Sequence, residues 1–229
     1  YPQVQVPNSK QFLLAQERLR VPNFETSSAA VAYYRKRADN EVAPQSEEER
    51  YGLGLALLAN GRPEEAVEIF TNLVLNDSRV IAYRSGLGQA QLDAGDFEAG
   101  LATFRKAVEL FPRNVPLTIH YAEALLYQDY ADEAHTVLLD LLNNVQPTPR
   151  QVKLLALAAS AAGDTAEAHY YMCEYHVMNG ELQEAIDQLR LALAVPELLD
   201  IQRSRFVARI EQLEKYLPKR KRRRLTETG

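Results

Sequence analysis

The chain has 229 residues, of which 46% are hydrophobic and 25% charged, and its formal net charge is −5. These values are ordinary for a soluble globular chain and exclude general disorder and a collagen-like repeat. The longest apolar run, residues 154–159, is far shorter than the ~20 residues that span a bilayer. Because the chain begins with Tyr1 rather than Met, we expect any targeting sequence to lie outside it.

Charge is distributed unevenly along the chain. Residues 219–229 carry six Lys or Arg and one acidic residue, whereas residues 1–218 carry 20 basic and 30 acidic residues. A body this acidic is a poor match for a phosphate backbone, so we expect no nucleic-acid partner. The basic run could bind nucleic acid, anionic lipid or lipopolysaccharide phosphate, but a solvated, disordered tail over residues 218–229 is the favoured interpretation.

The first predicted elements are two irregular helices, at about 9–19 and 26–40, separated by Val21-Pro22-Asn23. Proline cannot donate a backbone hydrogen bond, so a break between the two helices is expected there. We therefore treat residues 1–45 as an irregular N-terminal region.

Small turn residues then recur at a constant interval, at Gly61, Gly95, Asp129 and Gly163. Each is followed by a similar segment with a small residue five positions later. This spacing resembles the tetratricopeptide repeat, a helix–turn–helix unit that is about 34 residues long. The resemblance predicts helix pairs at 47–59 with 63–76, 79–94 with 97–111, and 115–128 with 131–143.

The repeat pattern has a physical explanation. Gly54, Gly88 and Ala122 fall where the first helix of each pair meets the second, and a larger side chain would hold the backbones apart. The seam to the next repeat is predicted to be filled by Phe70, Phe104 and Leu138. Since one repeat cannot bury its own apolar face, stacking of repeats must supply the core.

After Gly163 the period changes. The next turn glycine, Gly180, follows after only half of the repeat interval. Helices are predicted at 149–162, 165–179 and 182–194, and the middle helix fits both as the second helix of one unit and as the first helix of the next. A more polar helix at 198–216 is predicted to cap the end. The fold class is therefore an all-α solenoid of stacked antiparallel helix pairs, with the repeat domain over 46–217 and a phase break near residue 163.

The last quarter of the chain resembles a narrower family. Ala185-Ile186-Asp187-Gln188-Leu189 and, later, Ala208-Arg209-Ile210-Glu211-Gln212-Leu213 are similar to the C-terminal end of bacterial zinc metallopeptidases of the beta-barrel assembly-enhancing protease type. The segment from Ser9 to Ala15 is similar to the start of the repeat domain in that family. The resemblance covers roughly residues 8–217.

The zinc motif of that family, H-E-x-x-H, is absent from this chain, whose histidines are His120, His135, His169 and His176. The resemblance therefore implies a non-catalytic portion with no cofactor of its own, zinc being expected in a peptidase domain outside the chain. It further implies a periplasmic location and a role in bringing substrates and outer-membrane assembly partners to the protease. The alternative is a free-standing scaffold for a secretion or pilus assembly complex.

One cluster could carry other chemistry. His169, Cys173 and His176 share one helix face, and imidazole and thiolate are zinc ligands. Cys173 occupies the small position that Gly88 occupies earlier, however, so core packing is favoured over a metal site or a nucleophile. A single cysteine also excludes an internal disulfide.

The predicted binding surface is the concave groove of the repeats. Fixed positions of the first helices line this groove in the repeat family. Transferred by register, they are Tyr51, Leu55, Leu58, Ser85, Gln89, Leu92, Ile119, Glu123, Leu126, Tyr170, Glu174 and Val177. This mixture of tyrosine, leucine and carboxylate side chains suits an extended or partly unfolded protein chain better than a small charged ligand.

Overall fold

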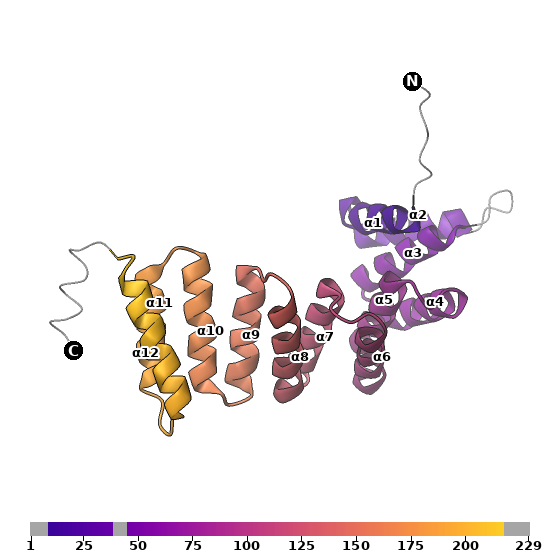
Figure 1. Cartoon of the computed structure of the whole chain (residues 1–229). Helices are drawn as coiled ribbons and strands as arrows, with labels where there is room; N and C mark the ends of the chain where they lie inside the picture. Colours follow the sequence, from indigo (N-terminus) through magenta and orange to yellow (C-terminus); the bar gives the residue numbers. More distant parts are fainter. Residues whose placement is uncertain (1–8, 39–44, 218–229) are drawn as a thin grey trace. The chain divides into compact units, whose positions relative to one another are not determined.

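A computed structural model describes residues 9–38 and 45–217 (Figure 1). These residues form twelve α-helices and one short 3-10 helix, η1, and contain no strand. The helices are α1 (Lys10–Arg20), η1 (Val21–Asn23), α2 (Ser27–Ala38), α3 (Glu47–Ala59), α4 (Pro63–Asn76), α5 (Ile81–Asp93), α6 (Phe97–Leu110), α7 (Val115–Tyr127), α8 (Ala131–Asn144), α9 (Pro149–Ala161), α10 (Thr165–Met178), α11 (Leu182–Leu193) and α12 (Asp200–Glu214). The all-α fold class is confirmed.

The predicted helices agree with the structure to within two residues at the bounds that it describes. α5 begins two residues later than predicted, because the Asp77 carboxylate accepts a hydrogen bond from the Arg79 amide at 3.1 Å and holds this segment in a turn. α12 is shorter at both ends, and Glu197 just before it has a φ of 59°. The predicted end of the second helix at residue 40 and the predicted disordered tail at 218–229 lie outside the described residues.

The turns confirm the predicted positions of the repeat. Gly61, Gly95, Gly163 and Gly180 all have positive φ values, between 68° and 85°. Asp129 occupies the same place in its own pair of helices with a φ of 61°. Aspartate tolerates the left-handed region better than most residues do, which explains how the repeat continues there without glycine.

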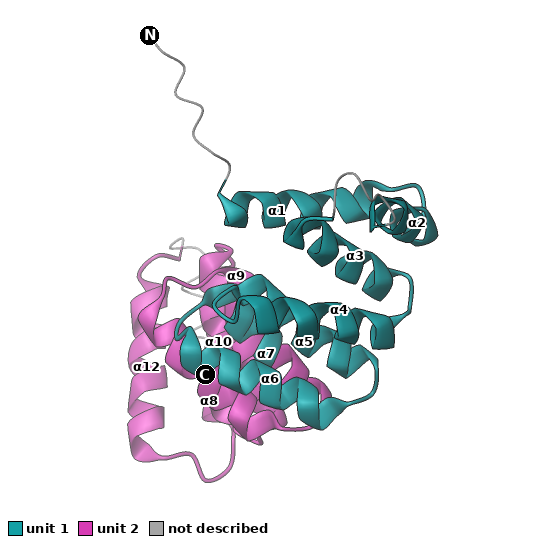
Figure 2. Ribbon diagram, turned by 90° about the vertical axis from the view of Figure 1, so that its right-hand side faces the viewer, with its two compact units in different colours: residues 1–121 teal, residues 122–229 magenta. Residues whose placement is uncertain are grey.

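The chain divides into two compact units, residues 1–121 and 122–229, with the boundary inside α7 (Figure 2). In unit 1 each helix packs on the next along the chain from α2 to α6, and the first helices α1, α3 and α5 also contact one another in order. One buried cluster runs from Leu14 to Ala90 through this unit. Unit 1 is therefore built as the repeat pattern predicts, with alternate helices forming two layers.

One aromatic ring packs between two successive helix pairs of unit 1. Phe70 of α4 is fully buried. A Cβ added at Gly54 of α3 or at Gly86 of α5 would lie 2.6 Å from a carbon of this ring. The ring therefore sits between two glycines, one in its own pair of helices and one in the next.

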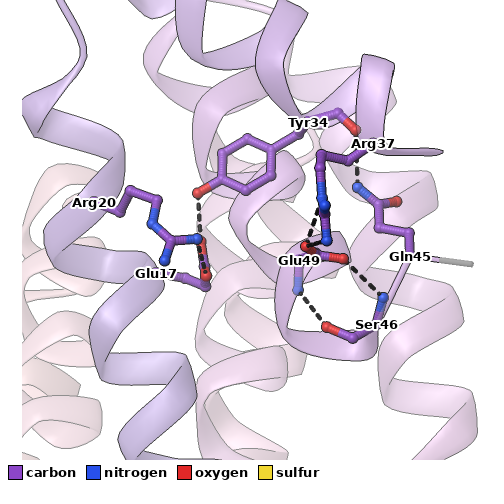
Figure 3. Close-up of polar contacts among 7 residues, drawn as sticks. All are labelled: Glu17, Arg20, Tyr34, Arg37, Gln45, Ser46 and Glu49. Carbon is purple, nitrogen blue, oxygen red and sulfur yellow. Dashed lines mark hydrogen bonds and ion pairs between the residues drawn. The ribbon is translucent and has the colours of Figure 1, made fainter. Parts of the chain in front are cut away.

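The N-terminal pair, α1 and α2, differs from the irregular region that the sequence suggested. Tyr34 of α2 is fully buried, and a Cβ at Gly52 would lie 2.7 Å from its ring, so Tyr34 occupies the place that Phe70 has one repeat later. Its hydroxyl donates to Glu17 of α1 at 2.5 Å, and Arg20 pairs with the same carboxylate at 2.7 Å (Figure 3). The step from Tyr34 to Phe70 is slightly longer than the constant repeat interval, which conceals this pair from a search at a fixed period.

A small polar network joins α2 to the start of α3 (Figure 3). Ser46 and Glu49 form a reciprocal capping box at the start of α3. Arg37 at the end of α2 donates to the Glu49 carboxylate at 2.8 Å, and Gln45 donates to the Tyr34 carbonyl at 3.0 Å. These bonds satisfy backbone and carboxylate groups on α2 and at the start of α3.

In unit 2, α10 is shared between two repeats. The ring of Tyr171 packs edge-on against the ring of His135 of α8, with the ring centroids 5.9 Å apart. In this contact α10 acts as the second helix of a repeat, packed on the second helix of the repeat before it. The ring of the neighbouring Tyr170 stacks on the ring of Phe206 of α12, with the ring centroids 5.6 Å apart. In this contact α10 acts as the first helix of a repeat, packed on the first helix of the repeat after it. α10 also packs on both α9 and α11. This double role is the physical basis of the half-repeat interval between Gly163 and Gly180.

Candidate partner-binding surface

The first helices of unit 1 carry seven of the predicted groove residues, in three exposure classes. Tyr51 is buried among Phe70 and Tyr83, with ring centroids 5.9 Å apart in both cases, so its side chain belongs to the core. Burial raises the pKa of its hydroxyl to about 12. The half-buried residues are Leu55, Leu58, Ser85, Leu92 and Ile119, while Gln89 is exposed.

Ser85 and His120 join two of these helices. Their Oγ and Nδ1 atoms lie 3.4 Å apart, between α5 and the part of α7 that belongs to unit 1. Gln89, one turn after Ser85, donates to Asp93 at 2.7 Å and keeps its exposed place on α5. The surface of the first helices of unit 1 is therefore polar at Ser85 and Gln89 of α5. Half-buried leucines, Leu58 and Leu92, come before and after these residues in the sequence.

One repeat position is exposed in three successive repeats. Gln89 of α5, Glu123 of α7 and Leu157 of α9 hold the same position of the repeat, and all three are exposed, Leu157 by 58%. The residues on either side of each, at 88 and 90, 122 and 124, and 156 and 158, are all buried. A side chain at this position is thus presented to solvent by a helix that is otherwise packed.

The sequence analysis named no groove residue on α9. One repeat beyond the predicted α7 positions Ile119, Glu123 and Leu126, the equivalent residues are Lys153, Leu157 and Ser160, which are all exposed. The Lys153 ammonium group lies 5.8 Å from the ring centre of Tyr175 on α10. The constant repeat interval predicts these residues, but the change of interval after Gly163 placed the next predicted positions on α10 instead.

The predicted groove residues of α10 face α12. Arg209 binds both carboxylate oxygens of Glu174, at 2.9 and 2.8 Å, and the Arg205 guanidinium lies 4.4 Å from the ring centre of Tyr170. Val177 is half-buried against the core of α10, α11 and α12. Beside these contacts is an open hollow of about 430 Å³, the α10–α12 hollow. Its lining residues are Tyr170, Glu174, Arg205, Ala208, Arg209 and Gln212.

The histidine and cysteine residues of α10 have separate environments. Cys173 is fully buried, and burial raises the pKa of its thiol to about 12, far from a reactive thiolate. His169 Nδ1 lies 2.8 Å from Gln188 Oε1, whereas His176 Nδ1 lies 2.6 Å from Glu181 Oε2. Among the described residues, no three His, Cys, Asp or Glu side chains are arranged to hold a metal ion.

Two family models of the same description, tetratricopeptide repeat, match the sequence. One covers residues 12–80, which takes in α1 and α2, and the other covers residues 91–158. The chain is a tetratricopeptide-repeat (TPR) protein. Repeats of this fold typically bind other proteins and carry no catalytic residues, so protein recognition is the general role of such a chain. A search of curated proteins found no match.

Solved structures resemble this TPR chain in fold. A Podosopora anserina protein of nearly identical kinesin light chain TPR-like repeats has a TM-score of 0.59 and 17% identity, over 76% of this chain and 95% of its own. MamA has a TM-score of 0.55 and 18% identity, over 82% and 93%. A TPR protein from Parabacteroides merdae has a TM-score of 0.52 and 10% identity, over 92% and 86%. At these identities the likeness concerns the fold alone. Within 9–38 and 45–217, no helix is both long and apolar enough to cross a membrane.

Proposed function

We propose that this TPR chain is a protein-binding module whose partner contacts an exposed repeat position of each unit, Gln89 of α5 in unit 1 and Glu123 of α7 and Leu157 of α9 in unit 2. The supporting observation is the exposure of Gln89, Glu123 and Leu157 between buried neighbours. Leu157 is 58% exposed at this place, so its aliphatic side chain is available to a partner. One amide, one carboxylate and one aliphatic side chain suit a protein segment, which offers both backbone polar groups and apolar side chains.

For the partner, we propose an outer-membrane β-barrel assembly component or an unfinished barrel protein in the periplasm. On this proposal the chain recruits substrates to a zinc metallopeptidase domain, which holds the zinc, while the chain itself binds no cofactor. The support is the sequence similarity of the last quarter of the chain and of the segment from Ser9 to Ala15. An upstream H-E-x-x-H motif in the full reading frame would support the parent enzyme, and its absence would favour a free-standing scaffold.

The exposed repeat positions can be tested with a matched pair of variants. One replaces Gln89, Glu123 and Leu157 with Arg. The control replaces Glu68, Ala102 and Thr136 with Arg, since these second-helix residues are also exposed and also recur once per repeat. Both variants add three arginines and remove one carboxylate, so they change net charge equally.

Photocrosslinking in living cells is the measurement. The photoreactive residue stands at position 153, an exposed residue of α9 one turn before Leu157 that both variants leave unchanged. We expect crosslinks to barrel proteins or their assembly machinery, lost in the first variant and kept in the control. Equal loss in both variants, or crosslinks to unrelated proteins only, would contradict the proposal. The isolated chain should also leave casein intact, with or without a chelator present.

A further inference from the structure

Arg205 is the accessible cation of the α10–α12 hollow. Its Nη2 pairs with the Glu167 carboxylate of α10, and its guanidinium lies 4.4 Å from the Tyr170 ring centre and 5.1 Å from that of Phe206. Contacts with aromatic faces hold the planar group in one orientation. Even so, 45% of the side chain stays exposed. Arg205 is thus oriented before a ligand arrives and remains open to one.

Arg209 has a different role in the same hollow. Its Nε and Nη2 bind Glu174 at 2.9 and 2.8 Å, and its Nη1 donates to Gln212 at 2.6 Å. Only 22% of its side chain is exposed. Because its nitrogens are engaged within the chain, Arg209 forms a wall of the hollow, and Arg205 is left to meet a ligand.

The side chains that line the α10–α12 hollow carry more positive than negative charge. They include two arginines, Arg205 and Arg209, and one carboxylate, Glu174, which already pairs with Arg209. A local excess of positive charge attracts an acidic ligand and repels a basic one. Charge complementarity therefore favours an anionic group in the α10–α12 hollow.

We propose that the α10–α12 hollow binds a carboxylate side chain from an acidic, extended segment of the partner protein, and that Arg205 contacts this carboxylate. A guanidinium group matches a carboxylate with two parallel hydrogen bonds. The proposal rests on the proposed function in that the partner is a protein, but it concerns a second contact, made by residues other than Gln89, Glu123 and Leu157.

The test uses the full chain and a fluorescent decapeptide of alternating Glu and Ser, with a Gln/Ser peptide as the uncharged probe. Binding is followed by fluorescence anisotropy. Arg205→Gln should weaken binding of the Glu peptide by about tenfold, the usual size of one lost charged contact. Arg205→Lys keeps the charge without the planar fork and should fall between. The control is Arg190→Gln, an α11 arginine that is exposed by 42% and pairs with Asp187, and it should bind like the parent.

A second variant separates binding from a structural role. Glu167→Gln removes the internal carboxylate that competes for Arg205, so it should tighten binding of the Glu peptide by about twofold or more. If Arg205 only fastened α12 to α10, Glu167→Gln would lower the melting temperature and leave the affinity unchanged. Melting temperatures of all variants are recorded alongside.

Three outcomes would overturn the proposal. Arg205→Gln and Arg190→Gln could weaken binding equally, or neutralising residues 219–224 could abolish binding that Arg205→Gln leaves intact. Phosphatidylglycerol vesicles or single-stranded DNA could also depend on Arg205 more strongly than the Glu peptide does, which would replace the carboxylate by a phosphate. None of these outcomes affects crosslinking from residue 153, so the proposed function would stand or fall separately.

Discussion

The two units solve the same packing problem differently. In unit 1, Phe70 and Phe104 lie against glycines of the first helices, so backbones approach closely around a flat ring. In unit 2, α10 contains no glycine, and its small buried residues are Ala166, Ala168 and Cys173. α10 meets α8 through Tyr171 and α12 through Tyr170, and the ion pair between Arg209 and Glu174 completes the contact with α12. A constant repeat interval thus permits one repeated slot, in which an aromatic ring of a second helix fits against a glycine of a first helix. A half-repeat interval instead requires a helix with two different packing faces.

The largest expected effect concerns the slot of unit 1. Phe70→Ala empties a space enclosed by α3 and α5, and it should lower the free energy of unfolding by ~3–5 kcal/mol. The corresponding change at Leu138 of α8, also fully buried, should cost ~2–5 kcal/mol. Urea unfolding measures both values. A cost below that of an exposed substitution at either site would contradict the seam assignment.

The reverse change tests the glycine side of the slot. A Cβ at Gly88 would lie 2.7 Å from the Phe104 ring, so Gly88→Leu should destabilise the chain by at least ~1–3 kcal/mol through overpacking. Glu98→Gln, at an exposed residue of α6, should stay within ~0.5 kcal/mol of the parent. Equal melting temperatures for the two variants would mean that the repeat register is misplaced.

The N-terminal pair offers a polar version of the slot. Tyr34→Phe keeps the ring against Gly52 but removes the hydroxyl that donates to Glu17, which is only 4% exposed. A buried acceptor that loses its donor should cost ~1–3 kcal/mol. Tyr33→Phe, next to it and 39% exposed, is the matched control and should change stability by less than ~0.5 kcal/mol. Indistinguishable unfolding midpoints would show that the Glu17 contact contributes nothing.

The double burial of α10 should protect its thiol. Burial raises the pKa of Cys173 to about 12, above its unfolded value, so the neutral thiol stabilises the fold at lower pH and this contribution is lost as pH rises toward 12. We expect a thiol reagent at mildly alkaline pH to label the protein in urea but not in native buffer. Rapid stoichiometric labelling of the native chain would contradict the packing of α10 against its neighbours.

The smallest effect comes from an ion pair in unit 1. Lys10 Nζ lies 2.6 Å from Glu47 Oε2, and this hydrogen bond from Lys10 lowers the pKa of the carboxyl group. Since the pair is about one-third exposed, Glu47→Gln should cost only ~0.2–1 kcal/mol near neutral pH. A lowered pKa stabilises the fold above the ordinary carboxyl pKa, and the benefit disappears as pH falls through the folded value. Unfolding midpoints of parent and variant should therefore converge in acid, and a gap that persists there would refute this origin.

Much of the fold could be predicted from the sequence because its signals are local. A turn glycine, or Asp129 in its place, once per repeat fixes where helices end, and small residues such as Gly88 mark helix crossings, so helix bounds and repeat register follow directly. The longer step from Tyr34 to Phe70 broke that period, and α1 and α2 were consequently not recognised as a repeat. The candidate surface was harder, because exposure depends on neighbours: Leu55 and Gln89 hold the same position of the repeat, yet Leu55 is half-buried and Gln89 is exposed.

The sequence by itself determined the helices, their turns and the place where the period halves, since each depends on residues close together in the chain. Tertiary structure alone decided which faces of those helices remained open. Tyr170 and Tyr171 are adjacent in sequence, but one stacks on α12 and the other packs against α8, because α10 lies between two sets of neighbours. Likewise, nothing in the sequence near Arg205 shows that Tyr170 and Phe206 hold its guanidinium beside a hollow. Tyr170 belongs to a helix that comes two helices earlier in the chain, and only folding brings the two side chains together.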